Sequence, residues 1–182
     1  IEDQGITRIG DALRYVSGVT PQRDRSNASD RFSIRGFDTS RILRNGFRTG
    51  VGFGDATGVS PNTIERVEVL KGPASVLYGQ VEPGGVVNYV PKRPLDVPFY
   101  NFQLRAGSFG LIEPAIDIAG PLTEDRRLTY RLNASYQDSD SFRDFVDSQT
   151  ISIAPVISYD FSDQTNLTFE YEYREQNQTY DD

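Results

Sequence analysis

Alternation of apolar and polar side chains is the feature that most restricts the folds open to this chain. From residue 99 onwards, apolar residues occupy every second position through most of five successive segments. Successive residues of a β-strand point to opposite faces of a sheet, so a period of two indicates strands. The five segments are residues 100–106, 112–119, 128–136, 150–159 and 167–174. Residues 99–182 are therefore predicted to form strands that have one apolar and one polar face.

The connections between these segments predict a meander of antiparallel strands. Short polar links alternate with a longer one, and they fall at residues 108–110, 123–127, 138–148 and 162–164. Strands of about 9–11 residues joined in this way are typical of a transmembrane β-barrel. A soluble antiparallel sheet with one wet face has the same pattern. The alternation alone leaves both alternatives open.

The first 98 residues differ in composition from the rest. They hold 13 of the 19 basic and 11 of the 26 acidic side chains, which leaves 6 basic against 15 acidic for residues 99–182. They also hold 13 of the 16 glycines, a density that indicates many turns. Helical spacing occurs over residues 7–19, and short β-like runs occur at 31–37, 65–71 and 86–90. A boundary near Pro98 follows, with a mixed α/β domain at residues 1–98.

The residue types that the chain lacks exclude several kinds of chemistry. It has no Cys, His, Met or Trp. Disulfides, Ser-His-Asp or Cys-His catalysis, and zinc or haem sites built on His or Cys are therefore excluded. No other acid–base constellation stands out, so an enzyme is not expected. Seven arginines between residues 23 and 48 are offset by nearby acids, so no nucleic-acid partner is expected.

Several motifs follow one another in a recognisable order. They resemble the plug domain of TonB-dependent outer-membrane receptors and, within that family, the ferric-siderophore receptors of the ferrichrome type. Two further motifs, at residues 119–122 and 130–132, resemble the family's first barrel strands, and this favours the barrel over the soluble sheet. The plug motifs are Ser33-Ile34-Arg35-Gly36-Phe37, Arg44-Asn45-Gly46, Ile64 to Gly79, Pro83-Gly84-Gly85-Val86-Val87-Asn88 and Lys92-Arg93-Pro94.

The resemblance implies a fold and a function. The fold is a mixed α/β plug domain, residues 1–98, followed by the N-terminal part of a transmembrane β-barrel, residues 99–182, with 22 strands when complete. The function is active uptake of a ferric siderophore, with a hydroxamate type favoured, across the bacterial cell outer membrane. The expected partners are the siderophore, the TonB energy-transducing complex and outer-membrane lipid, and the receptor is expected to be a monomer. No cofactor is expected, because the siderophore itself holds the iron.

Other interpretations stay open. The cargo of such a receptor can be another compound, such as haem or cobalamin. A different class of protein is a truncated plug that does not transport. Five strands cannot close a plugged barrel, and the family's TonB box would precede Ile1. We therefore expect this chain to be a piece of a larger receptor.

The resemblance places the ligand site at the apex of the plug. Three loops form this apex in the family, and they match residues 21–30, 38–41 and 47–54. A ferric siderophore is an oxygen-rich and often anionic chelate, which suits charge-assisted hydrogen bonds from arginine and contact with an aromatic ring. The positions that match or surround the family's ligand contacts are Arg23, Arg41, Ile42, Phe53 and Gly54.

Two other positions are expected to hold the plug in place. Arg35 and Lys71 match residues whose family counterparts pair with glutamates of the barrel wall. Ion pairs that face water are individually weak and are screened by salt, so they would hold the plug and still leave it removable. For Glu65, Arg66 and Glu68, we expect a solvated or internally paired strand edge.

Overall fold

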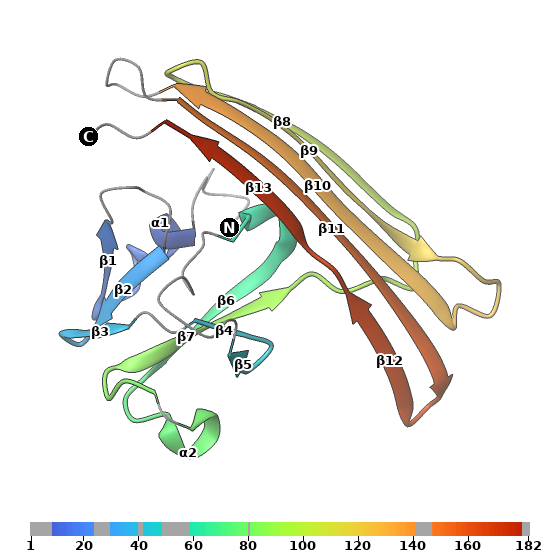
Figure 1. The fold of residues 1–182 in the computed structure, drawn as a ribbon. Helices are drawn as coiled ribbons and strands as arrows, with labels where there is room; N and C mark the ends of the chain where they lie inside the picture. Colours follow the sequence, from blue (N-terminus) through green and yellow to red (C-terminus); the bar gives the residue numbers. More distant parts are fainter. Residues whose placement is uncertain are drawn as a thin grey trace. The chain divides into compact units, whose positions relative to one another are not determined.

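The computed structural model describes residues 9–23, 30–39, 42–48, 59–79, 81–140 and 147–179 (Figure 1). The chain divides into two compact units, Ile1–Pro91 and Lys92–Asp182, and each is described by itself. Residues 92–98 thus belong to the second unit, and the first strand of that unit begins at Phe99. No helix in the described part of the chain is long and apolar enough to cross a membrane.

The first unit consists mainly of two small sheets. One is antiparallel and contains β1 (Val19–Arg23), β2 (Asp30–Ile34) and β3 (Phe37–Thr39) in that order. The other has the order β5 (Phe47–Arg48), β4 (Ile42–Arg44), β7 (Gly85–Pro91) and β6 (Ile64–Lys71). Within it, β4 and β7 are parallel and the other pairs are antiparallel. The helical segments among the described residues are α1 (Ile9–Leu13), α2 (Ser75–Tyr78) and a 3-10 turn at Pro61–Thr63.

Helix is scarcer than the sequence predicts. The helical spacing over residues 7–19 gives a helix only from Ile9 to Leu13 in the described part, and Val19 already belongs to β1. The chain turns between them through Gly18, which adopts a left-handed φ of 74°. Pairing of Val19 with Ile34 in the sheet therefore overrides the local helical pattern. The mixed α/β character predicted for this unit is not confirmed, because its described residues form mostly sheet with little helix.

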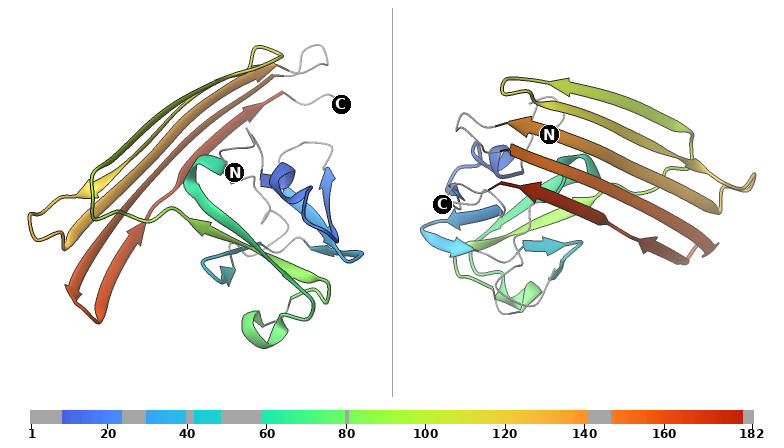
Figure 2. Two further views of the ribbon diagram at one scale, coloured as in Figure 1. Left: turned by 180° about the vertical axis from the view of Figure 1, so that it is seen from behind. Right: turned by 45° about the horizontal axis from the view of Figure 1, so that its top comes forward.

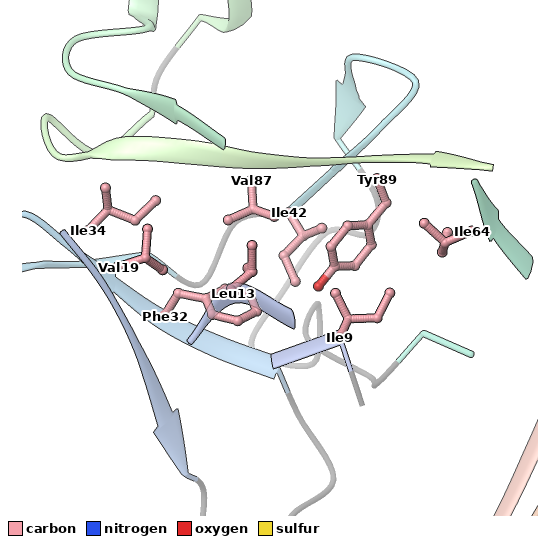
Figure 3. Packing of buried hydrophobic residues seen from close by; sticks show 9 residues of the cluster. All are labelled: Ile9, Leu13, Val19, Phe32, Ile34, Ile42, Ile64, Val87 and Tyr89. Carbon is pink, nitrogen blue, oxygen red and sulfur yellow. The ribbon is translucent and has the colours of Figure 1, made fainter. Parts of the chain in front are cut away.

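Buried apolar side chains join the two sheets and α1 into one core (Figure 3). Val87 and Tyr89 extend from β7 towards α1 and β2. A smaller group, Leu43, Ala74 and Val86, packs with Tyr78 of α2. Full burial of such a side chain contributes about 1.5–3 kcal/mol to folding. The larger cluster comprises Ile9, Leu13, Val19, Phe32, Ile34, Ile42, Ile64, Val87 and Tyr89.

The second unit is a single antiparallel sheet in which long strands lie side by side (Figure 2). Its strands follow the predicted meander in the order β12-β11-β10-β9-β8, and β13 also pairs with β11. The antiparallel strands predicted from the period of two are confirmed. Their bounds are β8 (Phe99–Ala106), β9 (Ile112–Pro121), β10 (Leu128–Asp140), β11 (Asp147–Ser162), β12 (Thr165–Glu170) and β13 (Tyr173–Gln178).

The fifth predicted strand is interrupted between β12 and β13. The register on β11 continues across the gap, because Val156 pairs with Glu170 and Ile153 pairs with Tyr173. Between them, the Tyr171 N–H donates a hydrogen bond of 3.1 Å to the Pro155 carbonyl. Proline has no N–H to return the second bond of such a pair, so the ladder breaks at this point.

The two faces of this sheet differ as predicted. In β8, the side chains of Tyr100, Phe102 and Leu104 are 67–74% exposed, whereas those between them are partly covered. Exposed apolar residues continue the same face on other strands, at Ile112, Ile151, Ile153, Ile157, Leu167 and Phe169. The buried polar residues of the opposite face are Glu113, Asp117, Thr129, Arg131, Asn133, Thr150 and Ser152. An apolar band on one face and polar groups on the other is the arrangement of strands in a membrane barrel.

Candidate functional site

The motifs of the first unit meet at one junction. Gly84 comes just before β7, and Gly85 is the first residue of β7. In space, the two glycines lie between the turn that joins β2 to β3 and the end of β6. A Cβ atom on Gly84 would lie closer than 3.0 Å to the Ile34 carbonyl oxygen, and one on Gly85 would do the same to the Leu70 carbonyl oxygen. The Gly72 N–H also donates a hydrogen bond of 2.9 Å to the Gly84 carbonyl. Glycine is needed here because the backbones approach too closely for any side chain.

The structure brings Arg35 and Lys71 to this junction. Arg35 lies in the β2–β3 turn with a φ of 52°, and its N–H donates to the Gly18 carbonyl at 2.9 Å. Its Nη1 would lie 3.6 Å from a Cβ atom on Gly72, the residue that follows Lys71. Both side chains are exposed, and neither forms an ion pair with a carboxylate of the described residues. Their pairing with barrel-wall glutamates stays a prediction.

A second network fixes the hairpin that precedes residues 49–58. The Gly46 N–H donates to Asn88 Oδ1 at 2.9 Å, and Asn88 Nδ2 donates to Glu68 Oε2 at 2.8 Å. Arg66 Nε donates to the other oxygen of Glu68 at 2.9 Å. The hydrogen bond from Asn88, and after it the one from Arg66, lowers the pKa of Glu68 below its usual value. The internally paired strand edge expected for these residues is confirmed. The sequence places Asn88 in a plug motif but does not show that its side chain bridges Gly46 and Glu68.

The residues predicted to contact ligand are only partly described. Arg23 is the last residue of β1, and its backbone pairs with Asp30 of β2. Arg41, Phe53 and Gly54 lie outside the described residues. The side chain of Ile42 packs in the core and is 4% exposed, so the structure gives it a packing role. All five ligand contacts stay predictions.

The polar face of the second unit carries two groups of buried charges that the sequence analysis did not identify. Asp117 of β9 forms ion pairs with Lys92, at an N–O distance of 2.9 Å, and with Arg131 of β10, at 2.7 Å. Further along β9, Glu113 accepts a hydrogen bond of 2.7 Å from Arg105 of β8. Their sequence signal is weak, because charged residues at the polar positions of a strand are more often solvated. In the described part of the chain, no group of three or more His, Cys, Asp or Glu residues is placed to hold a metal ion.

Comparisons with known proteins agree with this arrangement. Residues 1–86 match the family model described as TonB-dependent Receptor Plug Domain. The chain is 38% identical over 181 residues to the metal-pseudopaline receptor CntO of Pseudomonas aeruginosa, covering 100% of this chain and 25% of the relative. It is 33% identical over 166 residues to the ferrichrome outer membrane transporter/phage receptor of Escherichia coli, covering 88% and 22% of the two chains.

A solved structure supports the likeness over both units. The pyoverdine outer membrane receptor FpvA of Pseudomonas aeruginosa, bound to pyoverdine, superposes with a TM-score of 0.86 at 26% identity. The match covers 96% of this chain and 26% of that one. The chain thus spans about a quarter of the length of the curated relatives that it matches.

Proposed function

This chain belongs to the TonB-dependent receptors of the outer membrane, with their plug domain in residues 1–86, and from that premise we propose that the complete protein takes up a metal–siderophore chelate. The observation that carries the proposal is the succession of two different units in one chain. A unit packed around the plug motifs is followed directly by a sheet with an apolar and a polar face. Such a pair suits a filled barrel better than a soluble enzyme or a binding module.

The two units divide the work of transport in this proposal. The exposed apolar face of β8–β12 contacts lipid, and the buried polar face lines the barrel. The apex loops of the plug bind the chelate from outside, through Arg23 and the aromatic ring of Phe53 among others. The siderophore holds the metal, so the protein supplies no metal ligand and no cofactor. The TonB complex then supplies the energy that displaces the plug.

The glycine junction supplies the connection between plug and barrel in this scheme. Arg35 and Lys71 present two exposed cations at the same junction, because Gly84 and Gly85 pack closely between the β2–β3 turn and the end of β6. We propose that barrel-wall carboxylates in the rest of the receptor pair with these cations. Each exposed pair contributes about 0–1 kcal/mol, which is small enough for an applied force to break.

Two classes of ligand are supported by different relatives. A hydroxamate siderophore is the first candidate, because the plug motifs resemble those of the ferrichrome type and a ferrichrome transporter is 33% identical. A metal-pseudopaline chelate is the second candidate, because a receptor of that name is 38% identical over the whole chain. Haem and cobalamin serve as comparison ligands, because they are the alternative cargoes that the sequence leaves open.

Equilibrium binding to the purified complete receptor tests the proposal. The ligands are ferrichrome, metal-pseudopaline, haem and cobalamin, and each siderophore is also offered without its metal. We expect saturable binding of one metal-loaded siderophore and at least tenfold weaker binding of haem and cobalamin, a difference of about 1.4 kcal/mol. Preferential binding of haem or cobalamin would overturn the siderophore assignment. Binding of none of them would leave the non-transporting plug as the better interpretation.

A further inference from the structure

The segment that joins the two units is fastened to the sheet of the second unit at its start. This linker comprises residues 92–98. Lys92 Nζ lies 2.9 Å from Asp117 Oδ2 on β9. Arg131 Nη1, on the neighbouring strand β10, donates a hydrogen bond of 2.9 Å to the Arg93 carbonyl. The ion pair of the Lys92 side chain therefore ties the linker to β9, and the hydrogen bond to the Arg93 carbonyl ties it to β10.

Asp117 is the centre of this arrangement. Arg131 holds its carboxylate with two bonds, from Nε to Oδ1 at 2.8 Å and from Nη2 to Oδ2 at 2.7 Å. The side chains of Asp117, Lys92 and Arg131 are only 8–10% exposed. Two-pronged arginine–carboxylate pairs are among the strong and directional hydrogen bonds of proteins. Removal of the carboxylate would leave two cations buried without it, which is strongly unfavourable.

The other end of the linker is packed against the same strand. A Cβ atom on Gly120 of β9 would lie 3.3 Å from Pro98 Cα and 3.8 Å from the Val97 carbonyl oxygen. Gly120 therefore leaves the space in which the linker backbone lies against the sheet. The next residue, Phe99, begins β8, and the Arg131 guanidinium carbon lies 5.6 Å from the centre of its ring. Arg131 thus contacts the chain near both ends of the linker, at Arg93 and at Phe99.

We propose that Lys92, Asp117 and Arg131 form a linker anchor, which holds the plug end of the connecting segment to the sheet of the second unit while the plug itself is displaced. The boundary between the compact units, at Pro91 and Lys92, coincides with the first anchored residue. Displacement of the plug therefore stops at the anchor, and the β8–β9 pairing beyond it is not pulled apart. Asp117 and Arg131 are positioning residues, because they act through the linker and do not contact the ligand.

Distance measurements between spin labels test the anchor directly. The substitutions Asp96→Cys, in the linker, and Glu124→Cys, in the β9–β10 turn, carry the labels in the complete receptor. Both native side chains are exposed. With the native anchor, we expect a single narrow distribution of inter-label distances. Asp117→Ala should broaden it, because the linker loses its ion pair and Arg131 loses the partner that orients it. An unchanged narrow distribution would overturn the proposal.

Glu113→Ala is the matched control for Asp117→Ala. Glu113 also lies on β9, on the same face, and holds a buried ion pair with Arg105, but neither residue belongs to the linker. This control should leave the distribution narrow, and equal broadening in both variants would contradict the anchor. Lys92→Met covers the case in which Asp117→Ala does not fold. It keeps the Asp117–Arg131 pair and the Arg131 hydrogen bond to the Arg93 carbonyl, and it removes only the tie from Lys92 to Asp117, so it should also broaden the distribution.

A second measurement, of siderophore uptake, tests the role of the anchor in transport. It rests on the proposed function, whereas the distances between spin labels do not. Lys92→Met should keep the ligand affinity and slow uptake by about tenfold, because force on the plug would then be lost in a loose linker. A structural role alone would lower the amount of receptor without changing uptake per receptor. Broadened distances with normal uptake would refute the transport role of the anchor. Failure of the native receptor to take up any siderophore would refute the proposed function and leave the distance result standing.

Discussion

Substitution of Gly84 by alanine tests whether the glycine junction is built on close backbone approach. The added Cβ atom would fall closer than 3.0 Å to the Ile34 carbonyl oxygen and 2.9 Å from Phe37 Cβ. Neither neighbour is the far end of a flexible side chain, so the turn between β2 and β3 must move. Overpacking of this kind costs about 1–3 kcal/mol, and a backbone obstacle places Gly84→Ala near the upper limit.

Gly36→Ala provides the matched control in the same turn. Gly36 has a φ of 83°, but nothing lies within 4 Å of the Cβ atom that alanine would add. This substitution carries only the cost of a left-handed backbone, about 1–2 kcal/mol. Gly84 does not have a positive φ, so its substitution carries the steric cost without that of a left-handed backbone. We therefore expect Gly84→Ala to cost about 1–2 kcal/mol more than Gly36→Ala, from these two ranges.

Hydrogen exchange of the β7 backbone amides in the complete receptor measures this difference. Local opening governs the exchange, and each 1.4 kcal/mol changes its equilibrium constant about tenfold. A loss of about 3 kcal/mol in Gly84→Ala should speed exchange by about 100-fold, and Gly36→Ala should speed it by about tenfold. Equal exchange rates in the two variants would refute the argument from close approach.

Three further predictions follow from single residues. Arg23→Ala should weaken siderophore binding by about one to two decades, because a charge-assisted hydrogen bond is lost. In the same equilibrium titration Arg25→Ala should keep a Kd near the native one, and equal affinities of the two variants would refute the contact. The hydrogen bond from Asn88 lowers the pKa of Glu68 in the folded plug. The ionised carboxylate therefore stabilises the fold at every pH above the pKa that Glu68 has in the unfolded chain, and this stabilisation is lost as the pH falls through the lowered pKa of the folded state. Unfolding of Glu68→Gln should show a weaker dependence on acid, and an unchanged dependence would contradict it. Pro155→Ala should restore a donor to the β11 ladder and add about 0.5–1.5 kcal/mol, measured by thermal unfolding; a lower Tm would count against this explanation of the break.

The sequence predicts the strands of the second unit well because one physical pattern controls them. Each strand has one apolar and one polar face, so the period of two is visible without tertiary information. The break at Tyr171 was missed because the cause lies in another strand. Pro155 lacks the N–H that would donate a hydrogen bond to the Tyr171 carbonyl, and only the register of β11 places these two residues opposite each other.

The first unit is harder to predict because tertiary contacts decide its local structure. Residues 14–19 continue a helical pattern in sequence, yet Val19 pairs with β2 and ends it. The motif glycines are visible in the sequence, but the partner that makes Gly84 obligatory is a carbonyl 50 residues earlier. Sequence reasoning identified the motif and could not identify the neighbour.

The candidate site shows the same limit. Arg35 and Lys71 were predicted from the resemblance, and the structure brings them to one junction. The anchor was not predicted, because Lys92, Asp117 and Arg131 are separated by 25 and 14 residues and meet only through strand register. The ligand contacts depend largely on residues outside the described part of the chain.

Uptake of radioactive iron by cells that carry the complete receptor tests the central claim most directly. The cells lack other siderophore receptors, and the measurement is made with and without TonB. A plug that must be displaced for passage predicts saturable uptake of the metal–siderophore chelate when TonB is present and loss of that uptake, with binding retained, when TonB is absent. Equal uptake in both strains, or no uptake of any chelate that the receptor binds, would contradict the account.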